Sequence, residues 1–295
     1  MRLEHGQLTA YDQDGDPTAT LDTDLPSGAR LLAATADLGR VAAADAGQLW
    51  LKAAADSRRI PLAADAAGLL QDGMIIATAP VFARGATWST AHRIVLLDRG
   101  GAVLDDHLVP DACGAVAGVT VHPGLTQAVV EFAMGQDGTI AQGVQLRPSG
   151  QGLLRLDVRE LLAGEDPVVG GFSPSGDAVL LLPHPNDPST ATVLAWPDLH
   201  PLGRYDCADD PSIEHGIGFT GGFLGEDHVI LYAVEQGILI ASPDLSRVEH
   251  VVLEPPLDPR ADLEWLAPLG SHRFVTGVWA PGGERRAPIW QVHRD

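Results

Sequence analysis

Short apolar runs separated by tight polar turns occupy the chain from one end to the other. The clearest example is the turn Gly171-Phe172-Ser173-Pro174-Ser175-Gly176-Asp177, which the apolar run Ala178 to Leu182 follows directly. Gly, Pro, Ser and Asp between two apolar runs favour a reversal of the chain, so the pattern predicts two β-strands joined by a hairpin. Six copies of this pattern are found, at residues 31–44, 68–78, 118–132, 171–182, 221–232 and 263–278.

A second hairpin pattern alternates with the first. It consists of an apolar strand, a turn rich in Asp, Pro and Gly, and another short strand. Two hairpins in succession make a four-stranded sheet. The turns of the first pattern are spaced by roughly 34 to 51 residues, which brackets the usual length of a propeller blade, about 40 to 50 residues. The sequence therefore predicts an all-β chain whose residues 1–295 form a single β-propeller domain. The first strands of the second pattern lie at residues 7–12, 93–98, 144–147, 192–196 and 237–242.

The number of blades follows from the number of inner hairpins. Six are visible, and the 295 residues divide into about 49 per blade, so six four-stranded blades are favoured and seven are the alternative. The chain begins within an outer hairpin at 7–12 and closes on an apolar strand at 288–292. Strands from both termini are therefore expected to complete the last blade, which would leave no open sheet edge.

The turn Phe172-Ser173-Pro174-Ser175-Gly176 resembles the inner turn of the bacterial WD40-like and TolB-like propellers. The resemblance covers nearly the whole chain in pattern and is specific only in this turn. The Trp-Asp dipeptide of eukaryotic WD40 repeats is absent, since Trp50-Leu51 and Trp196-Pro197 stand where it would be expected. The resemblance implies a fold and implies no partner or activity.

The charge of the chain disfavours one class of partner. Acidic residues outnumber basic ones by 39 to 19, the formal net charge is −20, and the longest basic run is Arg285-Arg286. Nucleic-acid binding depends on cationic groups that displace counterions from phosphates, so neither nucleic acid nor a membrane surface is expected as a partner. A protein or a small molecule is expected instead.

Composition also bears on location. No apolar run approaches 18 residues, and the start of the chain lacks an apolar segment of the length found in secretory signals, so a cytoplasmic location is expected. Lys52 is the only lysine among the 19 basic residues, a bias typical of GC-rich bacterial genomes. Cys113 and Cys207 are too few for a disulfide scaffold and are expected to be buried thiols.

Motifs of familiar cofactor chemistry are missing. The turn around Ser173 misses the spacing of a nucleophile elbow by one residue, and Gly150-Gln151-Gly152 lacks the third glycine of a dinucleotide fingerprint. The segment Asp12-Gln13-Asp14-Gly15-Asp16 has alternating carboxylates, but the Glu that completes an EF-hand loop is absent. No cofactor and no metal are therefore predicted.

The blade register brings two sets of loops to one mouth of the predicted channel: those that lead into each inner strand and those that leave each second strand. A pocket lined by aromatic and a few polar groups is the default binding site, and the loop at 81–92 is longer than its counterparts. The alternative to ligand binding is that the loop at 81–92 only packs against the fold and that Trp265 belongs to the core. The residues expected to bind a ligand at this mouth are Phe82, Arg84, Trp88, His92, Glu264 and Trp265.

Two functions remain open. The first is a propeller without catalytic activity that binds a protein partner or a small ligand at the channel mouth. The second is an enzyme, a cyclase, isomerase, lyase or hydrolase, that acts on a small metabolite by acid–base chemistry. The structural alternative for its candidate residues is that they satisfy buried backbone groups, and the missing catalytic motif favours the binding protein. The candidate acid–base residues are Glu131, His184, Glu214 and His215.

Overall fold

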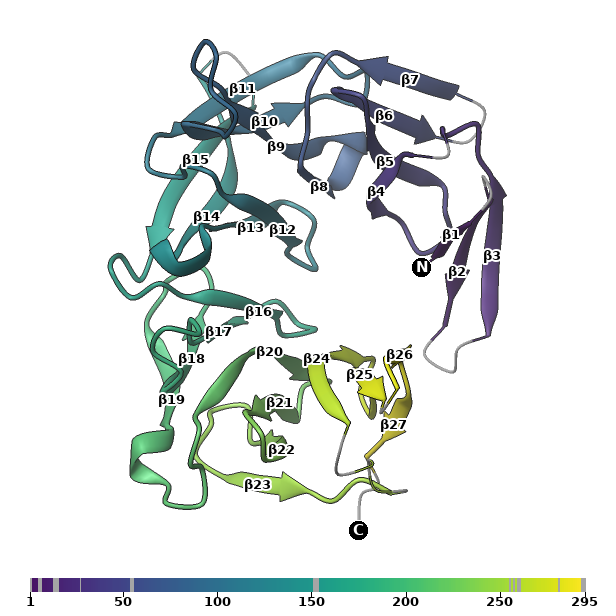
Figure 1. Cartoon of the computed structure of the whole chain (residues 1–295). Coiled ribbons are helices and arrows are strands. Elements are labelled where there is room, and N and C mark those ends of the chain that lie inside the picture. The colour runs from purple at the N-terminus through teal and green to yellow at the C-terminus, as the bar shows by residue number, and fades with distance from the viewer. Residues whose placement is uncertain are drawn as a thin grey trace. The chain divides into compact units, whose positions relative to one another are not determined.

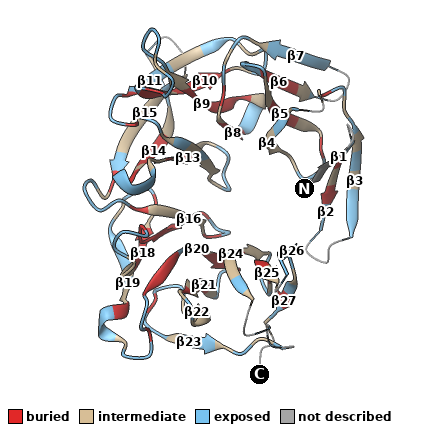
Figure 2. Ribbon diagram, in the orientation of Figure 1, coloured by how far each residue is buried: buried red, intermediate tan, exposed pale blue. Residues whose placement is uncertain are grey.

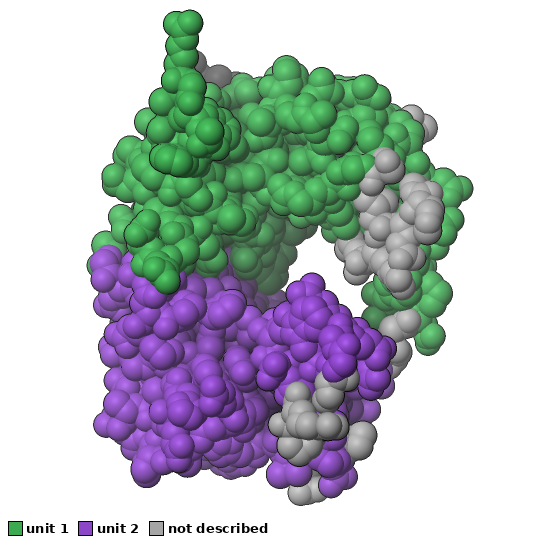
Figure 3. Space-filling view, in the orientation of Figure 1, with its two compact units in different colours: residues 1–163 green, residues 164–295 purple. Residues whose placement is uncertain are grey.

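The structure is a computed structural model in which strands dominate (Figure 1). The described part of the chain forms seven antiparallel sheets, six of four strands and one of three. The sheets fall into two compact units, residues 1–163 and 164–295 (Figure 3), and each unit is described by itself. The residues that the structure describes are 2–4, 7–12, 16–26, 28–53, 56–150, 154–254, 256, 258, 261–280 and 282–292.

The first unit holds four sheets. In each four-stranded sheet the strands pair in chain order, as consecutive hairpins require. The N-terminal sheet consists of β1 (Arg2–Glu4), β2 (Gln7–Tyr11) and β3 (Pro17–Asp22). The second sheet consists of β4 (Arg30–Ala34), β5 (Arg40–Asp45), β6 (Gln48–Ala53) and β7 (Asp56–Ile60). The third and fourth consist of β8 (Ala66–Leu69), β9 (Ile75–Val81), β10 (Ala91–Leu97) and β11 (Val103–Val109), then β12 (Val116–Val121), β13 (Gln127–Ala133), β14 (Thr139–Pro148) and β15 (Leu154–Leu161).

The second unit holds three four-stranded sheets, and the strands of the first two pair in chain order. The first consists of β16 (Val168–Phe172), β17 (Ala178–Leu182), β18 (Thr190–Ala195) and β19 (Pro201–Asp206). The next consists of β20 (Ile217–Leu224), β21 (His228–Ala233), β22 (Gly237–Ala241) and β23 (Val248–Val251). The last consists of β24 (Asp262–Leu269), β25 (Arg273–Ala280), β26 (Glu284–Arg286) and β27 (Ile289–Gln291). Short 3-10 turns interrupt the loops at η1 (Gln71–Gly73), η2 (Gly135–Asp137) and η3 (Cys207–Asp209).

All six predicted inner hairpins are present, as the first two strands of the six four-stranded sheets. Within each unit the first strands of successive sheets lie side by side, β4 with β8 and β8 with β12, then β16 with β20 and β20 with β24. This is the arrangement by which sheets pack radially in repeat folds. It places the loops at the ends of each sheet next to those of the following sheet.

The favoured count of six blades is wrong, because the described residues form seven sheets, which agrees with the alternative count of seven. The additional sheet is N-terminal: β1 pairs with β2, and β2 pairs with β3. Leu8 and Ala10 of β2 pack in one cluster with Leu38 and Val41 of the following sheet, so the two sheets share a core. The sequence placed the same hairpin in the last blade because it has the pattern of an outer hairpin and no inner hairpin precedes it.

The expected joint sheet of both termini is not shown. The C-terminal strand β27 pairs with β25, the second strand of its own sheet, through Phe274 and Trp290 among others. In the described residues β1 to β3 pair only with one another. A break after β26 lets both short strands use the same edge of β25, so the last sheet takes its outer edge from the C-terminal segment itself.

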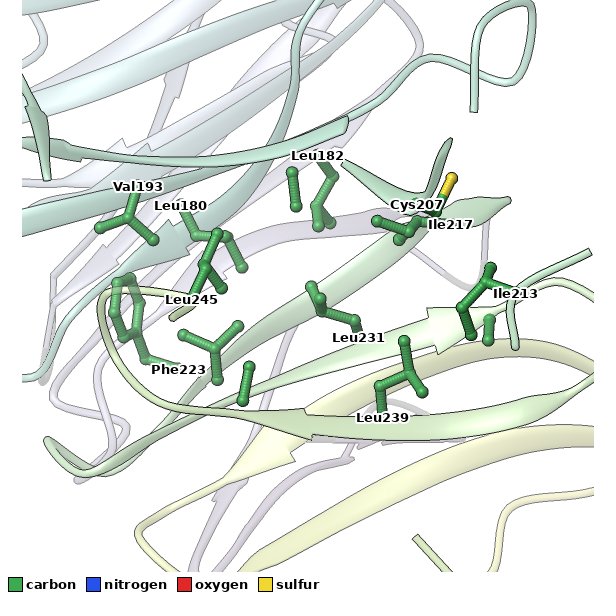
Figure 4. Packing of buried hydrophobic residues seen from close by; sticks show 14 of the residues in the cluster. Leu180, Leu182, Val193, Cys207, Ile213, Ile217, Phe223, Leu231, Leu239 and Leu245 are labelled. Atoms are coloured by element: carbon green, nitrogen blue, oxygen red, sulfur yellow. The ribbon is translucent and has the colours of Figure 1, made fainter. Parts of the chain in front are cut away.

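Buried side chains lie between neighbouring sheets, and the outer strands are exposed. The five residues of β17 are all buried, whereas most of β7 is exposed and appears pale blue in Figure 2. Figure 4 shows Leu180 of one sheet next to Leu245 of the following sheet, in a cluster that also holds Leu182, Leu231 and Leu239. Full burial of each such side chain stabilises the fold by about 1.5–3 kcal/mol, so the packing of sheet on sheet supplies the core.

The repeated turn has the geometry that its sequence predicts. The Ala178 N–H donates to the Ser173 Oγ at 3.1 Å, and the Gly176 N–H donates to the Ser173 carbonyl at 2.9 Å. Gly176 has φ +84°, a conformation that a residue without a Cβ adopts at little cost. Ser173 is buried and its hydroxyl accepts a hydrogen bond within the turn, so it has a structural role.

Within the described ranges, no helix has the length and apolar character that a membrane crossing requires.

Candidate functional site

The strand order fixes which loops share an end of each sheet. In an antiparallel sheet of four strands, the loop between the second and third strands lies at the same end as the connection that leaves the fourth. In the sheet β8–β11 these are residues 82–90 and 110–115. The predicted register of the loops is therefore correct within each unit, and the candidate residues of each unit lie near this end or in its loops.

The loop at residues 82–90, here called the aromatic loop, presents large apolar side chains to solvent. Trp88 is 69% exposed and Phe82 is 54% exposed, and Arg84 between them is exposed as well. Exposed single apolar residues are ordinary, but two aromatic residues and an arginine on one short loop are the composition of interface anchors.

The base of the aromatic loop is fixed. The Thr90 N–H donates to the Val81 carbonyl at 2.7 Å and closes the loop. The Gly114 N–H donates to the Ser89 carbonyl at 2.8 Å and lies 3.1 Å from the Ser89 Oγ, and the Cys113 thiol donates to the Thr90 carbonyl at 3.0 Å. Ser89 itself is buried. The exposed tip thus stands on a hydrogen-bonded base that joins it to the connection after β11.

His92 lies beneath the loop and not on its surface. Its side chain is fully buried, with Nδ1 2.8 Å from the Ala112 carbonyl and Nε2 2.9 Å from the Asp65 carboxylate. The Thr78 hydroxyl donates to the same carboxylate, and the imidazole packs against Phe132 at 5.2 Å between ring centroids. His92 therefore positions the loop and does not offer its ring to a ligand.

Burial and hydrogen bonds act in opposite directions on the pKa values of His92 and Asp65. Burial lowers the pKa of His92, but the bonds to Asp65 and to the Ala112 carbonyl outweigh it and leave the pKa above its ordinary value. For Asp65, burial raises the pKa, while the bonds from His92 and Thr78 outweigh it and leave the pKa below its ordinary value. Both shifts favour an ion pair between a protonated imidazole and a carboxylate.

One further residue, which the sequence did not single out, extends the exposed surface. Val116, the first residue of β12, is 74% exposed and lies two positions after Gly114, the residue bonded to Ser89. Sequence pattern alone does not separate this valine from the half-buried valines Val119 and Val121 of the same strand. Glu131, the candidate acid–base residue of this unit, is half-buried on β13 opposite Gly118.

In the second unit, Glu214 and His215 lie on the loop before β20 with exposed side chains. The His215 Nε2 is 3.5 Å from a carboxylate oxygen of Glu235. The Glu214 N–H donates to the Gln236 Oε1 at 2.7 Å, and the Gln236 amide donates to the Ser212 carbonyl. These contacts tie the loop to the turn between β21 and β22.

His184, the third candidate of this unit, is buried after β17. Its Nδ1 accepts a hydrogen bond from the Asn186 N–H at 3.2 Å. The bond caps a local turn, which agrees with the structural alternative for this residue. The four candidate acid–base residues thus divide between the two units, Glu131 in the first and the others in the second.

Glu264 and Trp265 begin the last sheet and make different contacts. The Glu264 carboxylate accepts hydrogen bonds from the Trp279 indole and, at 3.4 Å, from Arg285, whose guanidinium lies 4.3 Å from the centre of the Trp279 ring. Trp265 is partly exposed, and its ring occupies the space over Gly277 where a Cβ would clash. Trp279 and Arg285 therefore form a cation–π contact that Glu264 holds in place.

A polar cluster that the sequence did not reveal lies on the loop after β19. The Ser212 hydroxyl donates to Asp210 at 2.6 Å and lies 3.5 Å from the His250 Nε2, and the Tyr205 hydroxyl donates to Asp210 at 2.8 Å. In a catalytic triad the carboxylate orients the histidine. Here the carboxylate binds the serine itself, so the cluster holds the loop. The Ser212 hydrogen bonds are the main cause that lowers the pKa of Asp210.

The two cysteines differ in their exposure to solvent. Both thiols are free; Cys207 is buried as expected, and Cys113 is exposed, which corrects the expectation of a second buried thiol. Burial raises the pKa of the Cys207 thiol.

Among the described residues, no group of three or more His, Cys, Asp or Glu side chains is placed to hold a metal ion. Of the calcium-like segment Asp12 to Asp16, residues 13–15 lie outside the described residues.

Comparison with known proteins shows a shared fold and no shared family. No protein-family model matches the chain, and no curated protein matches it in sequence. Among solved structures, it is similar to the propeller of Dos1, with 10% identity and a TM-score of 0.59 over 97% of this chain and 72% of that one. It is also similar to a eukaryotic initiation factor, with 11% identity and a TM-score of 0.57 over 96% and 71% of the two chains.

A third similar structure is an acylaminoacyl peptidase, with 11% identity and a TM-score of 0.54. The match covers 95% of this chain and 45% of the peptidase chain. The predicted resemblance to β-propellers is confirmed at the level of the fold. Identities near one residue in ten show a shared fold and carry no statement about activity or partner.

Proposed function

We propose that this chain is a recognition module without catalytic activity, which binds a partner protein through the aromatic loop. The observation that carries the proposal is the exposure of Phe82 and Trp88 on a loop whose base is fixed by buried contacts. A rigid loop loses little conformational entropy when it binds, so its exposed aromatic area is available for affinity.

The chemistry of the loop fits a protein partner. Trp, Tyr and Arg are the residues that most often dominate binding energy at protein interfaces, and Trp88 and Arg84 stand on the same loop. Val116 adds apolar area beside its base. Such a surface fits a partner with a concave apolar pocket and an acidic or carbonyl-lined rim for the guanidinium.

The alternative of an enzyme has less support. Glu214 and His215 are exposed to water, and His184 caps a local turn. A general acid or base needs a position within hydrogen-bond reach of a bound substrate, in a site that excludes bulk water. The contacts of these residues are those of loop anchors.

The test compares a double variant of the loop with a matched control. Phe82→Ala/Trp88→Ala removes the exposed aromatic area, while Val103→Ala/Leu108→Ala removes apolar residues of similar exposure, 55% and 52%, from the outer strand β11. Each tagged protein is used to enrich partners from extracts of the source organism, and the enriched partner is then purified and its affinity measured.

The loop variant is expected to weaken the affinity by at least about thirtyfold, since an anchor residue contributes about 2 kcal/mol or more. The control variant is expected to bind as the unaltered protein does, and melting temperatures of both are expected to stay unchanged because the altered side chains are exposed. Equal affinity of the loop variant and the control would overturn the proposal.

A further inference from the structure

A cavity of about 800 Å³ lies at the opposite end of the sheets from the aromatic loop. It is bounded by the sheets β4–β7 and β8–β11, and the turns β8–β9 and β10–β11 form part of its wall. The volume is that of sites which hold small molecules. Apolar residues of the lining are Val41, Leu51, Leu69 and Ile75.

The lining is rich in cations although the chain as a whole carries a formal net charge of −20. Two of its four basic residues are already paired: Lys52 lies 3.3 Å from Asp24, and Arg58 lies 2.8 Å from Asp56. The other basic residues of the lining are Arg40 and Arg99, and its two carboxylates belong to Asp56 and Asp72.

Arg40 has neutral partners only, within the described part of the chain. Its guanidinium donates to the Leu70 carbonyl at 2.7 Å and to the Met74 carbonyl at 2.9 Å. A guanidinium has five N–H donors, so these two bonds leave others for a further acceptor. Burial lowers the pKa of Arg40, as expected for a cation that has lost water and gained no carboxylate.

Arg99 is held against the same cavity from the turn between β10 and β11. Gly73 has φ +80°, and a Cβ at this position would stand 2.7 Å from the Arg99 Cβ. The absence of a side chain at Gly73 therefore lets the arginine pack on the β8–β9 turn. No ion pair of Arg99 or of Asp72 is formed among the residues that the structure describes.

We propose that this cavity binds a small organic anion. Its carboxylate or phosphate group is bound by the guanidinium groups of Arg40 and Arg99, and its apolar part packs against Leu51, Leu69 and Ile75. Guanidinium groups suit both kinds of anion, because their planar donors match the spacing of two oxygens. The site is independent of the aromatic loop, which lies at the other end of the same sheet.

Isothermal titration with phenyl phosphate, benzoate and inorganic phosphate tests the proposal, with benzyl alcohol as the neutral probe. At least one of the two aromatic anions is expected to bind saturably with a Kd of about 1 mM or below. Binding by phenyl phosphate alone would identify phosphate as the preferred group, and binding by benzoate alone would identify carboxylate. No saturable binding of either aromatic anion overturns the proposal, as does equal binding of benzyl alcohol.

Variants locate the site. Arg99→Gln is expected to weaken binding at least fivefold, without a change in melting temperature because Arg99 is exposed. The control is Arg30→Gln, which removes the same charge at the far end of β4 and is expected to leave anion binding unchanged. Arg40→Gln is expected to weaken binding as well, and its melting temperature is compared because Arg40 also holds Leu70 and Met74. Unchanged affinity of Arg99→Gln for the anion would show that the anion binds elsewhere. Trp88→Ala is expected to bind the anion with normal affinity, whether or not the aromatic loop binds a partner.

Discussion

His92 illustrates how one buried polar residue can prepare a surface loop. Its two ring nitrogens face Asp65 and the Ala112 carbonyl, which come from the connections before β8 and after β11. A buried polar side chain with both nitrogens satisfied is specific for one arrangement of these segments, because any other leaves a buried donor or acceptor unpaired. The position of the aromatic loop thus depends on a histidine that never reaches its surface.

The ion pair of His92 and Asp65 predicts a pH dependence of stability. Because the folded pKa of His92 is raised above 6.5, its contribution is complete below about pH 6.5 and is lost as pH rises through the folded value. Because the folded pKa of Asp65 is lowered below 3.8, its contribution is complete above about pH 4 and is lost as pH falls through the folded value. The pair is therefore expected to stabilise most between about pH 4 and 6.5.

Urea unfolding of His92→Gln and of the unaltered protein at pH 5.5 and 8.5 measures this contribution. The variant is expected to lose about 1–3 kcal/mol of unfolding free energy at pH 5.5 and less at pH 8.5. His107→Gln, an exposed histidine on β11, is the control and is expected to differ little at either pH. A larger loss at pH 8.5 than at pH 5.5 would show that His92 is buried in its neutral form.

The inner hairpins are the elements that the sequence predicts best. Each depends on a turn and two adjacent apolar runs, so its signal is local, and all six are where the pattern predicts them. The N-terminal sheet was misplaced because its strands carry the same pattern as an outer hairpin. Its assignment depends on the contact of Leu8 with Val41, which lies far along the chain. The role of His92 was missed for the same reason, since its partners are 20 and 27 positions away.

The turn at residues 173–178 predicts a difference between two glycines. Gly176→Ala places a Cβ on a residue with φ +84° and is expected to lower the unfolding free energy by roughly 1–2 kcal/mol. Gly150→Ala is the control, since a Cβ there meets no atom within 4 Å and Gly150 does not have a positive φ. Its effect is expected to stay within about 0.5 kcal/mol. Equal losses of unfolding free energy in the two variants, measured by urea unfolding, would show that the positive φ of Gly176 does not require a glycine.

Across the first unit, two surfaces of different chemistry lie at the two ends of the sheet β8–β11: the aromatic loop at one end and the cationic cavity at the other. Blade register predicted the end on which the loop lies, since strand order alone decides it. The cavity was not predicted, because its cations come from turns and strands of two sheets. The expectation that the acidic chain binds no nucleic acid remains a prediction from its charge.

The most direct test of the recognition surface is photo-crosslinking from a benzoylphenylalanine placed at position 88, with position 108 as the control. Both positions are exposed, so both variants are expected to fold. One crosslinked partner is expected from position 88, and none of that species is expected from position 108. An excess of the unaltered protein is expected to abolish the crosslink, and an excess of Phe82→Ala/Trp88→Ala is expected to leave it. Identical crosslinks from positions 88 and 108, or equal competition by the loop variant, would show that the aromatic loop is not the surface that binds the partner.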